Sequence, residues 1–251
     1  MDDDLRNGLW NVLHLTYWQL VSSPWSRDAL DRVVISTWAN FYKKPVDQQP
    51  RDAIAAIRKD FFEWPWSTVY DFVEFMAGDK EDWDRTRTFI QLCNTVLERE
   101  LAGYRFVEDQ LIPIGTEFEL AAIEQARRDT MPYANVSEHL RQAASLLADR
   151  ERPDFRNSIK ESVLAVEATC QVLTGKRDTL GQCLNELERN VTLHPALRSA
   201  FSKLYGWTSD AEGIRHALLE APNLTVDDAR FMLVACSGFA SYLLAKSAQS
   251  G

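Results

Sequence analysis

The stretch of this sequence with the most chemical potential is "SDAEGIRHALLE", residues 209–220, which holds one of only 4 histidines. Arg215 and His216 are of the types that stabilise phosphate charge and transfer protons. On a regular helix His216 lies one turn from both Glu212 and Glu220, and these carboxylates favour the imidazolium form. A solvated, charged helix face would show the same pattern, so both interpretations stay open.

Arg215 faces another way on such a helix, because its neighbours one turn away are apolar. A partly buried guanidinium needs an anionic partner. Glu167 lies in the apolar run "LAVEATC", and Glu161 and Asn157 lie in the polar patch "NSIKES". An Arg215–Glu167 bridge that only fixes helix register remains an alternative to a functional site. Arg215 and His216 are the candidate catalytic pair, and the expected supporting residues are Ser209, Asp210, Asn157, Glu161, Glu167 and Glu220.

Other kinds of site find little support in the sequence. The 4 cysteines are isolated, without a CxxC pair or a histidine at ligand spacing. There is also no phosphate-binding lysine loop, dinucleotide fingerprint, serine elbow or HExxH motif. We therefore expect no metal and no cofactor, and we interpret His14, His139 and His194 as structural or solvated.

Composition narrows the range of partners. The formal net charge is −9 and the isoelectric point is near 5.0, which argue against broad binding to DNA or to an anionic membrane. A small, local RNA site remains open. No apolar run approaches the roughly 20 residues of a membrane span. The acidic start "MDDDLRNGLW" is unlike a secretory signal, so a cytoplasmic protein is expected.

The elements that must position these residues are mostly helices. All 8 tryptophans except Trp207 lie before residue 84, which predicts a Trp-rich helical region over 1–103. The segment "YRFVEDQLIPIG" predicts a β-hairpin near 104–113 within a connector of residues 104–115. A helical bundle is expected over 116–251, which makes the fold all-α. A first helix is expected from the helical spacing of Leu5, Leu9, Leu13, Tyr17 and Leu20. Further helices are expected over 26–43, 50–63, 65–78, 80–103, 137–150, 153–175, 179–190, 194–206 and 225–247. Another is expected to start at Thr116 and Glu119, which have the spacing of a capping box, while Thr225 is expected to cap the last helix and Pro195 suits a first-turn position.

Two helices of the expected bundle have distinct patterns. In 153–175, apolar residues from Ile159 to Leu173 alternate steps of four and three, which predicts a narrow buried seam. The last helix is almost wholly apolar from Phe231 to Leu244. Such a helix must be surrounded, either within the bundle or in a dimer interface. Asp210 is placed to cap a helix that carries Arg215.

Four separated motifs, "DDDLRNGLWN", "NSIKESVLAVEATC", "SDAEGIRHALLE" and "RFMLVACSGFASYLL", resemble the fourth subtype of the AbiJ N-terminal domain. This family occurs in bacterial abortive-infection proteins, which defend against phage. Its members usually carry a short segment before the first motif, whereas this sequence begins with it. Part of the family's N-terminus is therefore expected to be missing.

The C-terminal half of this family is similar to HEPN domains, which are helical bundles that often dimerise and include metal-independent ribonucleases. Their motif is an arginine, a polar residue, three variable residues and a histidine. Arg215 and His216 match its first two positions, but Glu220 stands where the histidine belongs. This departure puts catalysis in doubt, because a glutamate of ordinary pKa transfers protons less well near neutral pH.

Three functions follow from these observations. The resemblance implies a defence-associated HEPN-like module that binds RNA or cleaves it as an endoribonuclease, and that forms a homodimer through the bundle. The rival is a non-catalytic dimerisation or sensing module with a structural Arg–Glu network. A third hypothesis is a small-molecule pocket that uses Trp64, Trp66 and Tyr70. It is weaker than the other two, because clustered tryptophans usually belong to the hydrophobic core.

Overall fold

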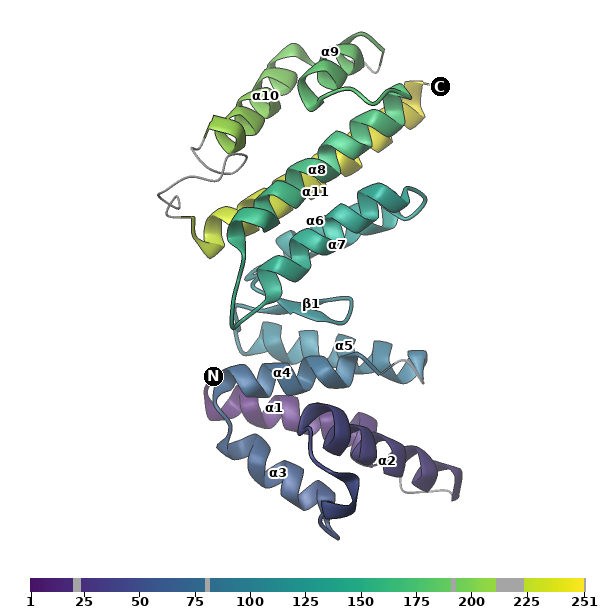
Figure 1. Ribbon diagram of the computed structural model, residues 1–251, viewed down its shortest axis with the longest axis vertical. Helices are drawn as coiled ribbons and strands as arrows, with labels where there is room; N and C mark the ends of the chain where they lie inside the picture. Colours follow the sequence, from purple (N-terminus) through teal and green to yellow (C-terminus); the bar gives the residue numbers. More distant parts are fainter. Residues whose placement is uncertain (20–23, 80–81, 191–192, 211–223, 251) are drawn as a thin grey trace. The chain divides into compact units, whose positions relative to one another are not determined.

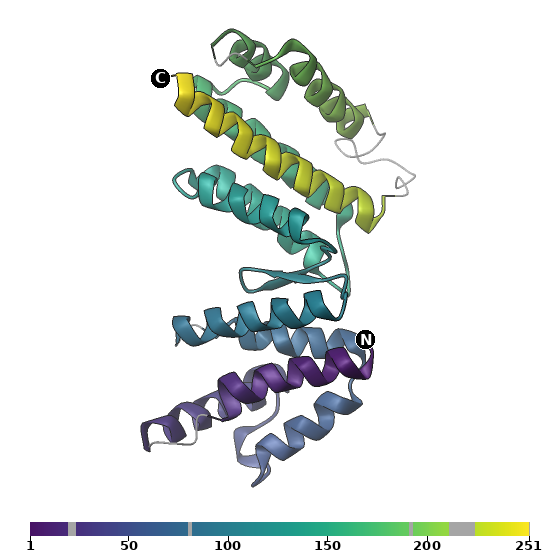
Figure 2. The same cartoon turned by 180° about the vertical axis from the view of Figure 1, so that it is seen from behind.

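The computed structural model describes residues 1–19, 24–79, 82–190, 193–210 and 224–250. These residues form eleven α-helices and one two-stranded hairpin, which confirms the all-α fold (Figures 1 and 2). The chain divides into two compact units, Met1–Leu111 and Ile112–Gly251. The division falls inside the hairpin, whose strands are β1 (Arg105–Val107) and β2 (Gln110–Ile112).

The first helix of unit 1 follows its sequence pattern. In α1 (Asp3–Leu13) the N-cap Asp2 accepts a hydrogen bond of 3.0 Å from the Leu5 amide. Acidic residues in the first turn also suit the positive end of the helix dipole. Leu5, Leu9 and Leu13, spaced by one turn, are buried as their periodicity predicts.

Two π-helical segments extend helices of unit 1, and the sequence did not indicate them. α1 continues into η1 (His14–Trp18), and α2 (Pro24–Ser36) continues into η2 (Thr37–Phe41). A π turn contains an extra residue and therefore rotates the side chains that follow it. In η1, the Tyr17 hydroxyl donates a hydrogen bond of 2.7 Å to the Met76 carbonyl. Burial raises the pKa of Tyr17 to about 12.

The rest of unit 1 comprises η3 (Val46–Gln48), α3 (Ala53–Glu63), α4 (Trp66–Ala77) and α5 (Trp83–Arg99). The helix expected from residue 50 begins later, because the Asp52 carboxylate caps it by accepting from the Ala55 amide at 2.9 Å. The helix expected to run to residue 103 stops earlier. Just past its end, Leu101 has a positive φ of 51°, which interrupts a right-handed helix.

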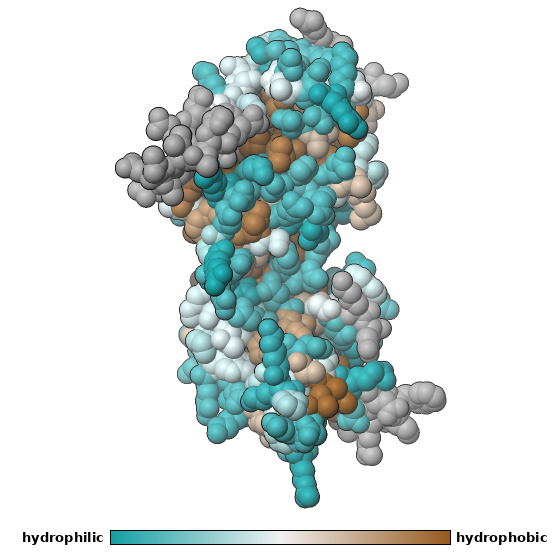
Figure 3. Space-filling view, viewed as in Figure 1, coloured by the Kyte–Doolittle hydropathy of each residue, from teal (hydrophilic) through white to brown (hydrophobic). Residues whose placement is uncertain are grey.

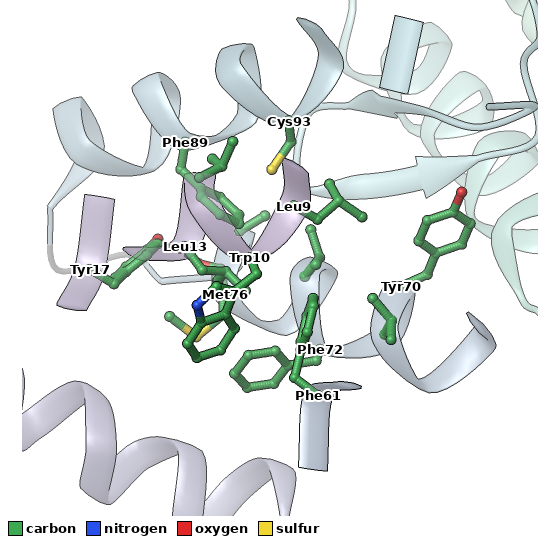
Figure 4. Close-up of a cluster of buried hydrophobic side chains, with 14 of the residues drawn as sticks. Leu9, Trp10, Leu13, Tyr17, Phe61, Tyr70, Phe72, Met76, Phe89 and Cys93 are labelled. Atoms are coloured by element: carbon green, nitrogen blue, oxygen red, sulfur yellow. Dashed lines mark hydrogen bonds between the residues drawn. The ribbon is translucent and has the colours of Figure 1, made fainter. Parts of the chain in front are cut away.

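An aromatic cluster forms the core of unit 1. Trp10 and Phe61 have ring centroids 5.3 Å apart, and Tyr17 and Phe89 meet edge-on at 5.2 Å. Figure 4 shows Leu9, Trp10, Leu13 and Tyr17 of α1 and η1 facing residues of α3, α4 and α5. Tilted and edge-on contacts are the favoured aromatic geometry. Most of the N-terminal aromatic residues therefore build core.

Unit 2 consists of α6 (Glu117–Thr130), α7 (Ala134–Ala148), α8 (Phe155–Thr174), α9 (Leu180–Asn190), α10 (Pro195–Asp210) and α11 (Val226–Ser250). Thr116 and Glu119 form the predicted capping box of α6. The hydroxyl and amide of Thr225 both donate to the Asp228 carboxylate before α11. α10 continues past its expected end at residue 206.

α8 is buried on more than the narrow seam that the sequence predicted. Ile159, Val163, Val166 and Cys170 are buried, but so are the small residues Ser158, Ser162, Ala165 and Thr169. These small residues permit close packing against α7, where the Ser158 hydroxyl donates to the Ala143 carbonyl at 2.8 Å. The seam prediction was therefore too narrow, because α8 packs against α7, α9 and α11.

α11 lies beside α8 in both views and also packs against α6 (Figures 1 and 2). By length and composition, Val226–Gln249 could cross a membrane, a test that core helices of soluble proteins also pass. Met232, Leu233 and Leu243 are buried, so the helix is part of the core of unit 2. Its opposite side exposes Phe231, Gly238 and Ala245. Figure 3 shows hydrophilic and hydrophobic residues interspersed on the visible faces of both units.

Candidate functional site

The expected catalytic pair lies outside the described residues. Arg215, His216 and Glu220 all fall within 211–223. Ser209 and Asp210 are the last two residues of α10, and only their place in that helix is described. The helix that Asp210 was expected to cap lies outside the described residues. The site can be built from the residues expected on α8.

The register between α7 and α8 decides what those residues meet. The Asp154 amide donates to the Leu146 carbonyl at 3.1 Å. One turn further along α8, Ser158 meets Ala143, as described above. As residue numbers rise on α8, the partner numbers fall on α7, so the helices run antiparallel. The next turn brings Glu161 opposite His139.

Glu161 and His139 form a close pair in this register. The Glu161 Oε2 and His139 Nδ1 atoms are 2.7 Å apart, and the Lys160 Nζ lies 3.5 Å from the Glu161 Oε1. The Glu161 side chain is 10% exposed, whereas the His139 side chain is 30% exposed. A carboxylate that accepts from Nδ1–H fixes the tautomer and leaves Nε2 as the reactive nitrogen. Among the described residues, Nε2 has no hydrogen-bond partner, so this nitrogen is open to contact with a ligand.

A second charged group lies beside His139 on α7. Arg141 donates two hydrogen bonds to Glu138, at 2.9 and 2.7 Å, and Gln142 donates a third at 2.8 Å. These bonds hold the pKa of Glu138 down at about 2. Glu138 is therefore ionised at physiological pH, and the Arg141 guanidinium that binds it offsets its charge.

Asn157 and Glu167 do not join this pair. The Asn157 side chain donates to Asp154, the N-cap of α8, at 2.6 Å. Glu167 follows Glu161 by six residues, which places it on a different helix face. Burial raises the pKa of Cys170 and Cys183, and the nearby Glu167 charge raises both further. Glu167 therefore faces the side of α8 that packs against α9.

Two comparisons gave no match, and one identifies the family. The family model described as AbiJ N-terminal domain 4 matches residues 1–129, which include unit 1 and most of α6. The chain belongs to this family. This family is associated with abortive infection, a phage-defence response. Neither the curated proteins nor the solved structures gave a significant match.

In this AbiJ-family chain, His139 was expected to be structural or solvated, and its contact with Glu161 agrees with a structural role, but the sequence did not identify the partner. The available signal was Glu161, a carboxylate on an otherwise apolar helix that required a partner. The choice of His139 depended on the antiparallel register of α7 and α8, which no local pattern encodes. Among the described residues, no group of three or more histidine, cysteine, aspartate or glutamate side chains could hold a metal ion.

Proposed function

We propose that this AbiJ-family chain is a cytoplasmic phage-defence module whose unit 2 is a HEPN-like bundle that binds or cleaves RNA. The observation that carries the defence role is the family match over residues 1–129. The helical architecture of unit 2 and the residues Arg215 and His216 support the RNA role. The net charge of −9 supports a local site over extended contact with nucleic acid.

The proposed cleavage needs no metal ion. A base removes the proton of a 2′-hydroxyl, the resulting 2′-oxygen attacks phosphorus, and an acid protonates the departing 5′-oxygen. Arg215 would stabilise the charge that develops on the phosphate, and His216 would transfer a proton. Because Glu220 replaces the usual histidine, a second imidazole is required, supplied by the dimer partner or by another histidine.

We also propose that the protein is a homodimer through unit 2. Phe231, Gly238 and Ala245 are seven residues apart, which places them on one face of α11. Phe231 is 57% exposed, and an added Cβ at Gly238 meets no atom within 4 Å. A Gly238→Glu variant should therefore fold as a monomer and fail to dimerise. Light scattering with size-exclusion chromatography would show this, and an unchanged dimer would place the interface elsewhere.

The defence role and the RNA role can be tested together. Phage plating on cells that express the wild type should show fewer plaques, and Arg215→Ala should restore plating. Arg177→Ala is a matched control, since Arg177 is an exposed arginine of unit 2 outside the proposed site. Purified wild type should degrade total RNA, whereas Arg215→Ala should not. Equal inertness of both proteins on RNA would rule out the catalytic version.

A non-catalytic dimerisation or sensing module is the second candidate. The pairing of Glu161 with His139 favours it, because a buried carboxylate is here satisfied within the chain. In that case Arg215→Ala would lower the melting temperature and disperse the dimer, without changing any RNA-directed activity. The two candidates therefore differ in whether Arg215→Ala loses activity on RNA while it remains folded.

A further inference from the structure

α10 covers part of unit 2 without being buried itself. It packs against α9 and α8 (Figure 1), and its side chains Phe201, Leu204 and Tyr205 lie over an apolar surface. Among residues 195–206, the part of α10 whose exposure is described, no residue is buried. The neighbouring α9, by contrast, fully buries Leu184. α10 therefore contributes to the core of unit 2 from its edge.

The surface beneath α10 belongs mainly to α8 and α11. Val163 and Val166 of α8 line it together with Met232 and Cys236 of α11. These four residues are at most 6% exposed. Because α10 lines the opposite side of the same contact, its removal would expose apolar side chains that are now enclosed.

The start of α10 is attached differently from its middle. Arg198 forms an ion pair with Glu188 of α9, with 2.6 Å between Nε and Oε2, and it donates to the Asn185 side chain at 2.7 Å. One and two turns later, Phe201 and Leu204 contribute apolar contact only, and the Phe201 ring stacks on Phe239 of α11. Charge and hydrogen bonding thus hold the start of the helix to α9.

We propose that α10 is a hinged lid, which pivots at its attachment to α9 and uncovers the apolar side of α8 and α11. Segments with few enclosed side chains open at a lower free energy than the core beside them. The pivot keeps the Arg198 ion pair, so opening breaks apolar contacts and leaves no charge without its partner. The opening does not depend on the RNA proposal for unit 2.

The opening has a consequence for the proposed RNA site. α10 ends at Asp210, five residues before Arg215 in the sequence. Movement of α10 therefore moves the point at which the segment with Arg215 is attached. This consequence, unlike the opening, rests on the proposed function.

The native cysteines of unit 2 can report the opening. Cys236 lies under α10, whereas Cys183 of α9 contacts Thr174 of α8, and Cys170 lies close to Cys183. All three cysteines are at most 2% exposed. Burial raises the pKa of Cys236 to about 12 and also raises the pKa of the other two thiols. Each thiol therefore reacts only after it becomes exposed.

Iodoacetamide labelling of the full chain, followed by peptide mass spectrometry, tests the proposal. Cys236 should be labelled at least about 10-fold faster than Cys170 and Cys183, because opening of the lid exposes Cys236 alone. Low concentrations of urea should change the Cys236 rate little and raise the Cys170 rate steeply, since the urea dependence follows the area that becomes exposed.

Variants of α10 separate lid opening from general loss of stability. Phe201→Ala should accelerate the labelling of Cys236 about 5-fold and leave Cys170 unchanged, because it removes the ring that stacks on Phe239. Lys203→Ala is the matched control on an exposed position of the same helix and should change neither rate. Equal rates at Cys236 and Cys170 in the wild type, or a Phe201→Ala variant that accelerates both cysteines or neither, would overturn the proposal.

Discussion

Glu161 shows how the surroundings of one residue set its chemical role. Its carboxylate is nearly excluded from water, yet it has an imidazole at 2.7 Å and an ammonium at 3.5 Å. Removing a carboxylate from water is costly unless such partners compensate for lost hydration. His139 therefore stabilises Glu161, while Glu161 orients His139. This mutual dependence would serve equally in a catalytic site and in a structural network.

Substitution of His139 measures this dependence. His139→Ala should lower the free energy of unfolding by about 1–3 kcal/mol, because it leaves a buried acceptor without its hydrogen bond. The double variant with Glu161→Gln should lose less than the sum of the two single variants. Urea denaturation at pH 7 measures all three. Strictly additive losses would mean that the two side chains do not interact in solution.

Two glycines with opposite surroundings give a second prediction. A Cβ on Gly8 would lie 2.6 Å from Cγ1 of Val96 on α5, whereas a Cβ on Gly181 in α9 would meet nothing within 4 Å. The Val96 side chain is stiff because it is β-branched. Gly8→Ala should therefore destabilise the protein by about 1–3 kcal/mol.

Gly181→Ala is the matched control within a helix, outside the proposed dimer face, and should stabilise by about 0.5–1 kcal/mol, since it lowers the entropy lost on folding. Urea denaturation of both variants against the wild type gives the sign of each effect. Destabilisation of similar size by both substitutions would refute the distinction between the crowded and the open position.

At the scale of elements, the helices that sequence predicted well are those with caps. Thr116 and Thr225 both adopt their expected capping roles, and Pro195 begins α10 as expected. Local side-chain bonds determine these features, so local sequence suffices to find them. The π-helical segments η1 and η2 depend on packing against other elements. Neither they nor the α7–α8 register could be deduced from local patterns.

The hydrogen bond from Tyr17 of η1 to Met76 of α4 predicts that the protein becomes less stable at alkaline pH. The pKa of Tyr17 is raised to about 12, mainly by burial, so the folded state retains a proton that an unfolded tyrosine releases near pH 10. Stability from this group is complete below about pH 10 and is lost as pH rises toward 12, by up to about 1.4 kcal/mol per pH unit.

Tyr17→Phe should therefore be less stable than the wild type by about 1 kcal/mol at pH 8, because it lacks the hydrogen bond to the Met76 carbonyl. The difference should shrink or reverse by pH 11. Urea denaturation at the two pH values measures both effects, and a difference that stays constant with pH would contradict the assignment to Tyr17.

At the scale of the whole molecule, the hairpin determines where the chain can be cut so that unit 1 keeps its complete core. Phe106 and Leu111 belong to its hydrophobic core and are 1% and 0% exposed. The Asn94 side chain accepts from the Phe106 amide at 2.7 Å, and the Glu74 carboxylate accepts from the Leu111 amide at 2.8 Å. Sequence patterns marked the hairpin as a connector, because turn residues and short strands show where the helical pattern stops. These local patterns do not show in which hydrophobic core the side chains of the two strands are buried.

Fragments of the chain test this view of the hairpin. A fragment of residues 1–113 should fold cooperatively, whereas 1–103 should be largely unfolded, because it lacks two buried side chains worth roughly 3–6 kcal/mol together. Circular dichroism with urea denaturation compares the two. The full-length variant Leu111→Ala is the control for changes in chain length and should destabilise unit 1 by about 2–5 kcal/mol without unfolding unit 2. If 1–103 were as stable as 1–113, the hairpin would be a linker in solution, and the core of unit 1 would be complete within its five α-helices.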